Sequence, residues 1–308
     1  MHDLERQRLT TDPDPTRLLD VDVVIFDFDG TLYEGTDFVP LYLDILQAAV
    51  EPDVPELAAL QRDVLAGRHV LQLGDLFHFA TRSILRPEPE PPQDRLGLRI
   101  AQVLDLEGAA SATPSDLEGC HVGFDAPVTY VGDPWQISAA ISHAFGIEES
   151  TRRDAFESVR HTMNGPDYDL GVPPCLSSLL DRFAHVPDRI LVTNTSADLA
   201  SACVDKVGVT DRFTEIVFGA AKPMGLARLI TDRVEAGADP GRMLCVGDNY
   251  WNDILPAYQL GAQSVLIDPL DIDRVSDAPL HLRELAQLEA ILAGATTSAV
   301  DIAGGGHR

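Results

Sequence analysis

Short apolar runs rich in β-branched residues recur along the chain, and each has the length and composition of a buried strand. The runs span residues 21–26, 189–193, 216–218, 243–246 and 264–267. Between them, apolar residues repeat at helical spacing. This alternation predicts an α/β fold, in which a Rossmann-like parallel sheet carries helices on both faces.

Two of the predicted helices lie on either side of the second apolar run. The first has apolar side chains at i, i+3, i+4 and i+7, from Leu176 to Phe183. The second continues at a four-residue step from Leu199, and we expect Thr195 to cap its start with Asp198 three residues later. Each helix therefore has one apolar face that can pack against the sheet.

The first and second apolar runs are separated by about 160 residues, far more than one crossover helix needs. We therefore expect a mostly α-helical cap domain over residues 36–168, inserted between core segments 21–35 and 169–292. The polar start, residues 1–20, is expected to be a mobile arm. The Gly/Ala/Thr-rich end, residues 293–308, is expected to be disordered.

Local signals within the insert predict helices and one long loop. Asp133-Pro134 is a typical helix start, and Thr151 with Asp154 forms a second start signal. The stretch RPEPEPPQDR at residues 86–95 contains four prolines, which forbid a regular helix. We expect this stretch to be a loop.

Charge narrows the range of partners. Acidic residues outnumber basic ones 49 to 23, which gives a formal net charge of −26. The only adjacent basic pair is Arg152-Arg153, so the chain lacks the basic patch that attracts nucleic acid or an anionic membrane. We expect neither partner.

Cysteine spacing and hydropathy indicate a cytoplasmic protein. The four cysteines are far apart and form neither a zinc motif nor a disulfide framework, which favours a reducing compartment. The N-terminus is too polar for a signal peptide. Charge-free stretches reach only about 14 residues, against the 18 or more that a membrane span requires.

Asp27 and Asp29 stand two residues apart where the first predicted strand ends, and ligands bind at this edge of open parallel sheets. Their spacing lets both carboxylates face one reacting group. Gly30 permits a sharp turn, and Thr31 adds a hydroxyl donor for an anion. An acidic strand end that merely caps a turn is the alternative reading of this motif.

Thr193-Asn194 ends the second strand and could supply phosphate ligands or, equally, a turn and helix cap. Lys222 is one of only two lysines, the other being Lys206. Its compact ammonium, just before a predicted helix, suits a site that contacts a phosphate oxygen and a carboxylate. An exposed loop lysine is the alternative.

Asp248 and Asp253 follow the fourth apolar run. Together with Asp27 and Asp29 they would form an oxygen-rich cluster, whose carboxylates repel and raise one another's pKa. A hard divalent cation removes this repulsion. Mg²⁺ accepts few carboxylates together with water and phosphate oxygens, so it is the expected cofactor.

These motifs, in this order, resemble those of the haloacid dehalogenase superfamily of phosphohydrolases. The matching residues are FDFDGTL with Asp27 and Asp29, Thr193-Asn194, Lys222-Pro223, and GDNYWND with Asp248 and Asp253. The resemblance covers about residues 20–35 and 170–270 and implies a helical cap between the first two motifs. Too few residues separate Asn194 from Lys222 for the family's alternative cap position.

The resemblance implies a mechanism. Asp27 would attack phosphorus and form an aspartyl-phosphate, and Asp29 would protonate the leaving oxygen and then deprotonate water. Mg²⁺ would be held by Asp27, the Asp29 carbonyl and Asp248, with Asp253 acting through water or by orienting Lys222. The catalytic set would be completed by donors to the phosphoryl oxygens. These donors are Thr193, the Asn194 amide and Lys222, with Gly30, Thr31 and Tyr33 lining the phosphate pocket.

The expected activity is hydrolysis of a phosphomonoester of a small metabolite. Asp29 disfavours dehalogenation, since dehalogenases of this superfamily lack the second acid. A phosphomutase acting on a sugar phosphate and a non-catalytic binding protein remain alternatives. Specificity would come from the cap, and six of its residues are candidates for lining the pocket: His78, Arg82, Tyr130, Trp135, His161 and Asn164. The alternative for each is packing or surface solvation.

Overall fold

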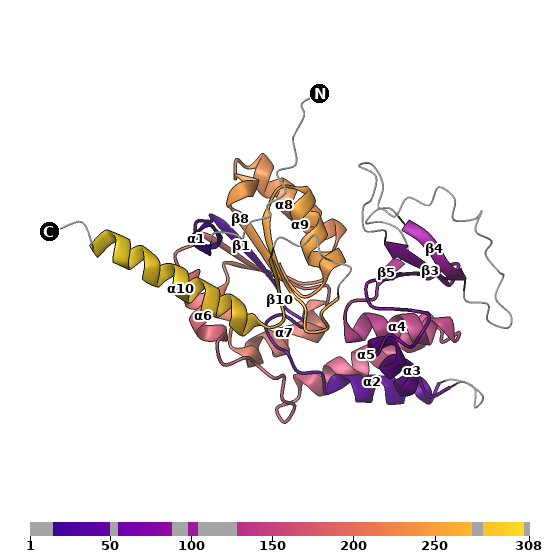
Figure 1. The fold of residues 1–308 in the computed structure, drawn as a ribbon. Helices are drawn as coiled ribbons and strands as arrows, with labels where there is room; N and C mark the ends of the chain where they lie inside the picture. The colour runs from indigo at the N-terminus through magenta and orange to yellow at the C-terminus, as the bar shows by residue number, and fades with distance from the viewer. Residues whose placement is uncertain (1–14, 50–54, 88–97, 104–127, 273–279, 305–308) are drawn as a thin grey trace.

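A sheet of six parallel strands forms the centre of the molecule. The computed structural model describes residues 15–49, 55–87, 98–103, 128–272 and 280–304 (Figure 1). Its strands run in the order β10-β9-β8-β1-β6-β7, and every neighbouring pair is parallel. Their bounds are β1 Val23–Asp27, β6 Asp188–Val192, β7 Glu215–Val217, β8 Met243–Gly247, β9 Gln263–Ile267 and β10 Leu280–Leu282. The five predicted strands are confirmed, and β10 is an addition.

Strand β1 lies where the direction of chain progression reverses. From β1 the chain adds β6 and β7 on one side and β8, β9 and β10 on the other. Such a switch point is where open α/β sheets bind ligands, beyond the carboxyl ends of the strands. The fold therefore places the end of β1, with Asp27, at the expected position for a site.

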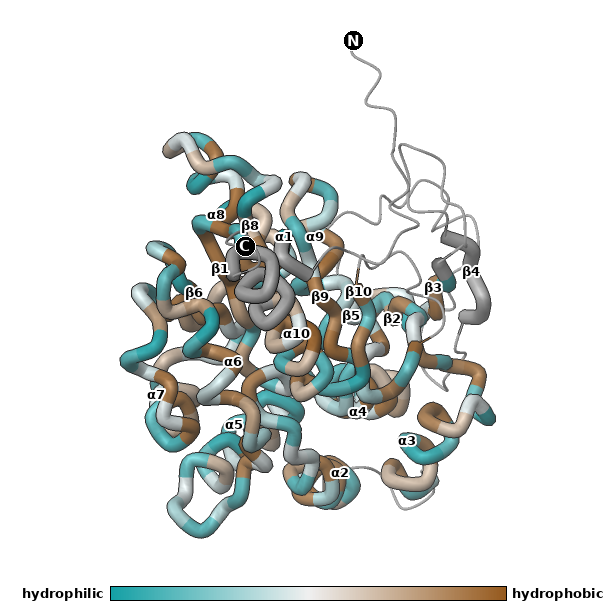
Figure 2. Tube along the Cα trace, turned by 60° about the vertical axis from the view of Figure 1, so that its left-hand side comes forward, coloured by the Kyte–Doolittle hydropathy of each residue, from teal (hydrophilic) through white to brown (hydrophobic). Residues whose placement is uncertain are grey.

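Helices cover both faces of the sheet, as the sequence predicts. Val24 and Phe26 of β1 belong to the apolar core on one face, while Val23 and Ile25 belong to the core on the other. The strands are correspondingly brown along β1 and β9 in Figure 2. The helices that cover the two faces of the sheet are α1 Pro15–Leu19, α6 Leu176–Arg182, α7 Ala197–Val207, α8 Met224–Glu235, α9 Leu255–Gln259 and α10 Leu285–Gly304.

The elements from α2 to α5, inserted between β1 and α6, form a separate, mostly helical layer beside the sheet (Figure 1). Its helices are α2 Phe38–Gln47, α3 Leu57–Leu65, α4 Pro134–Ala144 and α5 Glu149–Asn164. It also contains an antiparallel sheet in the order β4-β3-β2-β5, which the sequence analysis did not predict. Its strands are β2 Leu76–His78, β3 Ser83–Pro87, β4 Leu98–Val103 and β5 Val128–Tyr130.

Short strands explain why this second sheet is hard to predict. Strands β2 and β5 have three residues each, too few to show a two-residue period. The proline-rich stretch begins inside β3, which includes Arg86 and Pro87. Its remaining residues, 88–95, lie outside the described part of the chain.

Both ends of the chain differ from expectation. Residues 15–19 of the expected mobile arm form α1, because Leu18 is buried in the core. Residues 293–304 of the expected disordered tail belong to α10, whose first half is anchored by buried Leu285 and Leu288. Ala-rich sequence then favours continuation of the helix. Residues 1–14 and 305–308 lie outside the described residues.

Helix starts in the insert were predicted with mixed success. Asp133 caps α4 as expected, accepting a hydrogen bond from the Gln136 amide, and Pro134 follows it. Helix α5 begins at Glu149, so Thr151 and Asp154 lie inside the helix rather than at its cap. The predicted cap, Thr151, therefore lies three residues after the observed cap position, Glu148.

Most of the candidate specificity residues are used in packing or local structure. Trp135 stacks on Phe38 at 4.0 Å between ring centroids and so joins α4 to α2. His78 ends β2 and its Nδ1 contacts Thr81, while Arg82 lies in the following turn. The remaining three have three different environments. Tyr130 is buried in β5, His161 lines a surface hollow on α5, and Asn164 donates to the carbonyl of Leu199.

Two polypeptide crossings connect the insert to the core, and they touch. The amide of Gly35 donates to the carbonyl of Leu170, and the amide of Glu34 donates to that of Gly171, each at 3.0 Å. Gly171 has φ +65°, and a Cβ there would lie 2.8 Å from the Gly35 nitrogen. Glycine is needed because the two backbones approach so closely.

Replacing Gly171 with alanine is expected to lower the free energy of unfolding by about 2–3 kcal/mol, from the left-handed backbone and the collision together. Gly67→Ala is the matched control. Its φ is +66° and nothing lies within 4 Å of the added Cβ, so only the backbone cost applies. Denaturant unfolding should rank Gly171→Ala clearly below Gly67→Ala, and equal losses would show that the close approach is unimportant.

No helix in the described ranges combines the length and apolar character needed to cross a membrane. Of the four cysteines, Cys175, Cys203 and Cys245 are free thiols, and Cys120 lies outside the described residues.

Candidate active site

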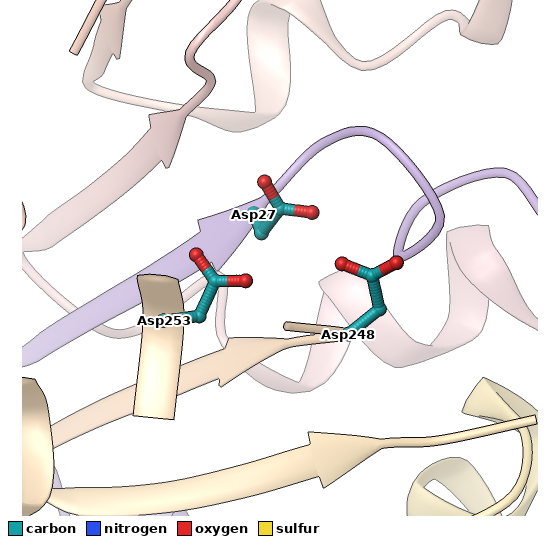
Figure 3. Close-up of side chains that lie close together, drawn as sticks. All are labelled: Asp27, Asp248 and Asp253. Carbon is teal, nitrogen blue, oxygen red and sulfur yellow. The ribbon is translucent and has the colours of Figure 1, made fainter. Parts of the chain in front are cut away.

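Three carboxylates converge at the switch point of the sheet (Figure 3). Asp27 ends β1, Asp248 directly follows β8, and Asp253 belongs to a π-helical turn, η4 (Tyr250–Ile254). One oxygen from each lies within 4.8 Å of the others. The structure thus brings together three of the four acids that the sequence assigns to a metal.

Burial makes this cluster electrostatically costly. Loss of solvent raises the pKa of Asp27 to about 7, with Asp253 and Asp29 adding to the rise and Lys222 opposing it. The pKa of Asp248 is also raised well above its ordinary value, first by burial and then by the charge of Asp27. Protons or a cation must offset this negative charge, and three carboxylates with an open side suit a hard divalent ion.

Lys222 lies beside the cluster. Its Nζ contacts Asp27 Oδ1 at 2.5 Å and Asp253 Oδ1 at 2.7 Å, and its side chain is almost fully buried. Burial alone would lower the pKa of Lys222, but the two carboxylates outweigh it and raise the pKa, so the ammonium stays charged. Asn194 holds the Lys222 backbone, accepting from its amide at 2.6 Å and donating to its carbonyl at 3.3 Å.

The turn after β1 shapes the space around Asp27. Thr31 Oγ1 donates to Asp27 Oδ2 at 2.9 Å. Gly30 has φ +84°, and a Cβ there would collide with the carboxylate of Asp248. A glycine is therefore required here both for the turn and for the close approach of the Asp248 carboxylate.

Asp29 has a different environment, in which four donors surround one carboxylate. Tyr33 donates to Oδ1 at 2.6 Å and Arg160 at 2.5 Å, while two threonine hydroxyls donate to Oδ2, Thr193 at 2.7 Å and Thr195 at 3.3 Å. Burial favours the protonated form, but the charge of Arg160 and these hydrogen bonds prevail and lower the pKa of Asp29. Asp29 is therefore a negatively charged acceptor in this arrangement.

This environment corrects one expectation from the sequence. Thr195 does not cap α7, because Ser196 occupies the cap position and the Thr195 hydroxyl is directed to Asp29. The pattern of a Thr followed by an acid at the third position could not reveal that another carboxylate competes for the hydroxyl. The hydroxyls of Tyr33 and Thr193, which the sequence assigns to the phosphate site, contact Asp29 in this structure.

Arg160 is the site residue that sequence reasoning missed. It lies on α5 and is completely buried. A signal was present, since Phe156, Val159 and Met163 repeat at helical spacing and Arg160 occupies the i+4 place in that apolar stripe. An arginine on a buried helix face needs a partner, and here the partner is Asp29.

A second contact joins the insert to the core beside the carboxylates. Asn249, next to Asp248, donates from Nδ2 to Asp133 Oδ2 at 3.0 Å. Asp133 is the residue that caps α4, and burial raises its pKa to about 6. The insert therefore contacts residues next to the cluster at two points, through Arg160 of α5 and through Asp133 at the start of α4.

The raised pKa values predict how stability depends on pH. A carboxyl group with a raised pKa favours the folded state while it is protonated, and this contribution is lost as pH rises from the ordinary value, 3.8, through the raised one, about 7 for Asp27 and about 6 for Asp133. Metal-free protein should therefore unfold more easily at about pH 7.5 than at about pH 5.5.

Thermal denaturation in EDTA at these two pH values, with and without excess Mg²⁺, measures the effect. At the higher pH, Mg²⁺ should raise Tm by about 5 °C, because it replaces the missing protons. In Asp27→Asn protein the pH slope should be smaller. A metal-free protein that is equally stable at both pH values would show that ionising the buried carboxyl groups does not destabilise the fold.

Comparisons with known proteins find likeness in structure only. The sequence matches no family model and no curated protein. Among solved structures, a HAD-hydrolase, YfnB from Bacillus subtilis, bound to magnesium, has 16% identity and a TM-score of 0.50, covering 88% of this chain and 98% of that chain.

Two further structures carry different activities in their descriptions. A predicted phosphoglycolate phosphatase from Haemophilus somnus 129PT has 16% identity and a TM-score of 0.49, with 88% and 98% of the two chains covered. A 2-haloacid dehalogenase from Pseudomonas syringae pv. tomato DC3000 has 18% identity and a TM-score of 0.41, with 89% and 99% covered. At these identities the likeness is one of fold.

Proposed function

Because the chain has the fold of the haloacid dehalogenase-like hydrolases, we propose that it is a Mg²⁺-dependent phosphatase that acts on a small-metabolite phosphomonoester through an aspartyl-phosphate on Asp27. One observation carries this proposal. Two carboxylates leave the same strand end with different neighbours: Asp27 belongs to the three-carboxylate cluster and contacts Lys222, whereas Asp29 lies outside that cluster and contacts Arg160. Acids with separated environments suit separate roles in one reaction.

Asp27 has the position of a nucleophile. Thr31 and Lys222 each donate to one of its oxygens, which fixes the carboxylate, and each oxygen retains a lone pair. In the first step an Asp27 oxygen bonds to phosphorus while the bond from phosphorus to the ester oxygen breaks. The leaving oxygen takes a proton by way of Asp29. Because Asp29 is ionised, the phosphomonoester monoanion supplies this proton to the carboxylate, which passes it to the leaving oxygen.

Water completes the reaction in the second step. The ionised Asp29 accepts a proton from a water molecule as that water attacks phosphorus. The bond between phosphorus and Asp27 breaks, which releases inorganic phosphate, and Asp29 then loses its proton to solvent, which restores both carboxylates. Lys222 stabilises negative charge on Asp27 and on the phosphoryl group throughout.

The acid cluster fits a divalent cation. Asp27 and Asp248, with the Asp29 backbone carbonyl, would hold Mg²⁺, and Asp253 would act through Lys222, which it contacts at 2.7 Å. When bound, Mg²⁺ neutralises phosphate charge and orients the phosphoryl group. The raised pKa values of Asp27 and Asp248 support this assignment, because a bound cation would offset the negative charge of the buried cluster.

Asp29 also favours phosphoester over carbon–halogen chemistry. A halide leaves as a stable anion and needs no proton, whereas an alkoxide leaving group requires a proton donor. Asp29, two residues after the nucleophile, can pass such a proton to the leaving oxygen.

The insert supports a small substrate. The insert contacts residues next to the carboxylates at two points, where Arg160 meets Asp29 and where Asp133 meets Asn249. A lid over the reacting atoms excludes bulky groups such as a phosphoprotein and limits access of water.

The experiment that tests the proposed function is a phosphate-release screen with Mg²⁺. It covers sugar phosphates, nucleoside monophosphates, polyol phosphates and a phosphopeptide, with Asp27→Asn protein as the blank. We expect release from one or more small esters and little from the phosphopeptide. Transfer of the phosphoryl group within a sugar phosphate, without release, would indicate a phosphomutase instead.

A further inference from the structure

Arg160 combines complete burial with a direct contact to a proposed catalytic acid. Its Nη1 lies 2.5 Å from Asp29 Oδ1 and 3.2 Å from the Tyr33 hydroxyl oxygen. It belongs to α5, in the insert, whereas Asp29 and Tyr33 belong to the core. The guanidinium is therefore a charged group that the insert delivers to the site.

Stability alone does not account for this arrangement. Among the described residues, Nε and Nη2 of Arg160 are buried without a hydrogen-bond partner. Burying a guanidinium is costly unless its donors are satisfied, and a purely structural arginine would be expected to use them. Within the described ranges only Nη1 makes hydrogen bonds, and its partners are Asp29 and Tyr33. The position of the guanidinium therefore serves its contact with the site rather than the satisfaction of its own donors.

The C-terminal end of α5 is fixed to the core close to Arg160. Lys206 donates to the carbonyls of Met163 and Gly165, at 3.2 and 2.7 Å, and Asn164 donates to the carbonyl of Leu199. Arg160 lies one helical turn before this attachment. Arg160 is therefore held against Asp29 by a part of α5 that is hydrogen-bonded to the core.

Asp29 has one cationic donor and three neutral ones. All four donor residues are buried. The O–H bonds of Tyr33, Thr193 and Thr195 can each turn away from Asp29, whereas the N–H bonds of the Arg160 guanidinium have fixed directions and carry a positive charge. A carboxylate bound in this way keeps one orientation. The ionised form with fixed oxygens is the form that accepts a proton from water in the second step.

We propose that Arg160 is a positioning residue, which holds Asp29 as the base that activates water for hydrolysis of the aspartyl-phosphate. This inference rests on the proposed function. Arg160 acts through Asp29 and does not touch the reacting atoms.

The test uses 4-nitrophenyl phosphate, whose aryloxide leaves without a proton donor. kcat/KM then reports phosphorylation of Asp27, while the decay of acid-quenched aspartyl-phosphate, followed by intact mass, reports the water step. Arg160→Met should slow the water step by about 100-fold and leave kcat/KM within about threefold, so that kcat and KM fall together. Arg160→Lys should recover part of the rate because it keeps the charge.

Controls separate positioning from general damage. Arg152→Met removes another arginine of α5, whose Nη1 donates to the carbonyl of Ile147, and should match the wild type. Tyr33→Phe removes the other donor to Asp29 Oδ1 and should slow the water step less, in the same direction, even where Arg160→Met fails to fold. In the Asp29→Asn background, Arg160→Met should cause no further slowing.

Equal losses in kcat and kcat/KM would overturn the inference, as would further slowing in the double variant, because either result assigns Arg160 a structural or substrate-binding role. A wild-type protein that releases no phosphate from any ester would instead remove the proposed function, and the inference with it.

Discussion

Asp27→Asn protein is expected to lose turnover by a factor of about 10⁴ or more while keeping its fold, since an amide of nearly the same shape cannot act as the nucleophile. The local contacts explain why the fold survives. Lys222 keeps its pair with Asp253, and the amide oxygen can still accept from Thr31. Loss of one carboxylate also relieves repulsion with Asp248, so Tm of the metal-free protein should stay equal or rise slightly.

Initial-rate assays on the best substrate, with circular dichroism as the fold check, measure this effect. Asp44→Asn is the matched control, because Asp44 is an exposed acid on α2. It should have wild-type activity. Asp27→Asn protein that retains more than about one hundredth of wild-type activity would remove Asp27 as nucleophile.

Removal of divalent metal is expected to abolish activity. Excess EDTA should give no measurable turnover, added Mg²⁺ should restore it, and Ca²⁺ should inhibit, because the cluster needs a small octahedral ion to orient the phosphate. Asp248→Ala should weaken Mg²⁺ binding more than Asp253→Ala, since Asp253 is already paired with Lys222.

Calorimetric titration of each variant with Mg²⁺ measures the binding order directly, without reference to turnover. Full activity in EDTA would contradict the metal assignment. The reverse order of the two variants would assign Asp253, rather than Asp248, as the direct ligand.

The core of the site could be predicted from sequence because its acids follow strands. Asp27 and Asp248 end or follow runs that are apolar on both faces of the sheet, and parallel strands bring such ends to one edge. Lys222 could be predicted as a site residue because it is one of only two lysines in the chain. The other, Lys206, holds the end of α5, which composition alone does not show.

Contacts between the insert and the core could not be predicted in the same way. Arg160 and Asp133 meet Asp29 and Asn249 only because two helices dock beside the sheet. Such docking depends on the whole insert, including strands too short to show a period, and no local spacing encodes it. The same limit applies to Thr195, whose hydroxyl binds Asp29 instead of capping α7.

Covalent phosphorylation of Asp27 is the central claim, and mass spectrometry of acid-quenched enzyme tests it most directly. Protein mixed with its best substrate and Mg²⁺, quenched in acid during turnover and digested, should yield the peptide with Asp27 heavier by one phosphoryl group. The modification should be absent from Asp27→Asn protein. With 4-nitrophenyl phosphate, whose leaving group needs no proton, it should be more abundant in Asp29→Asn protein, because only the water step is then slowed. Phosphate release at full rate with the Asp27 peptide always unmodified, or with the phosphoryl group on another residue, would contradict the account.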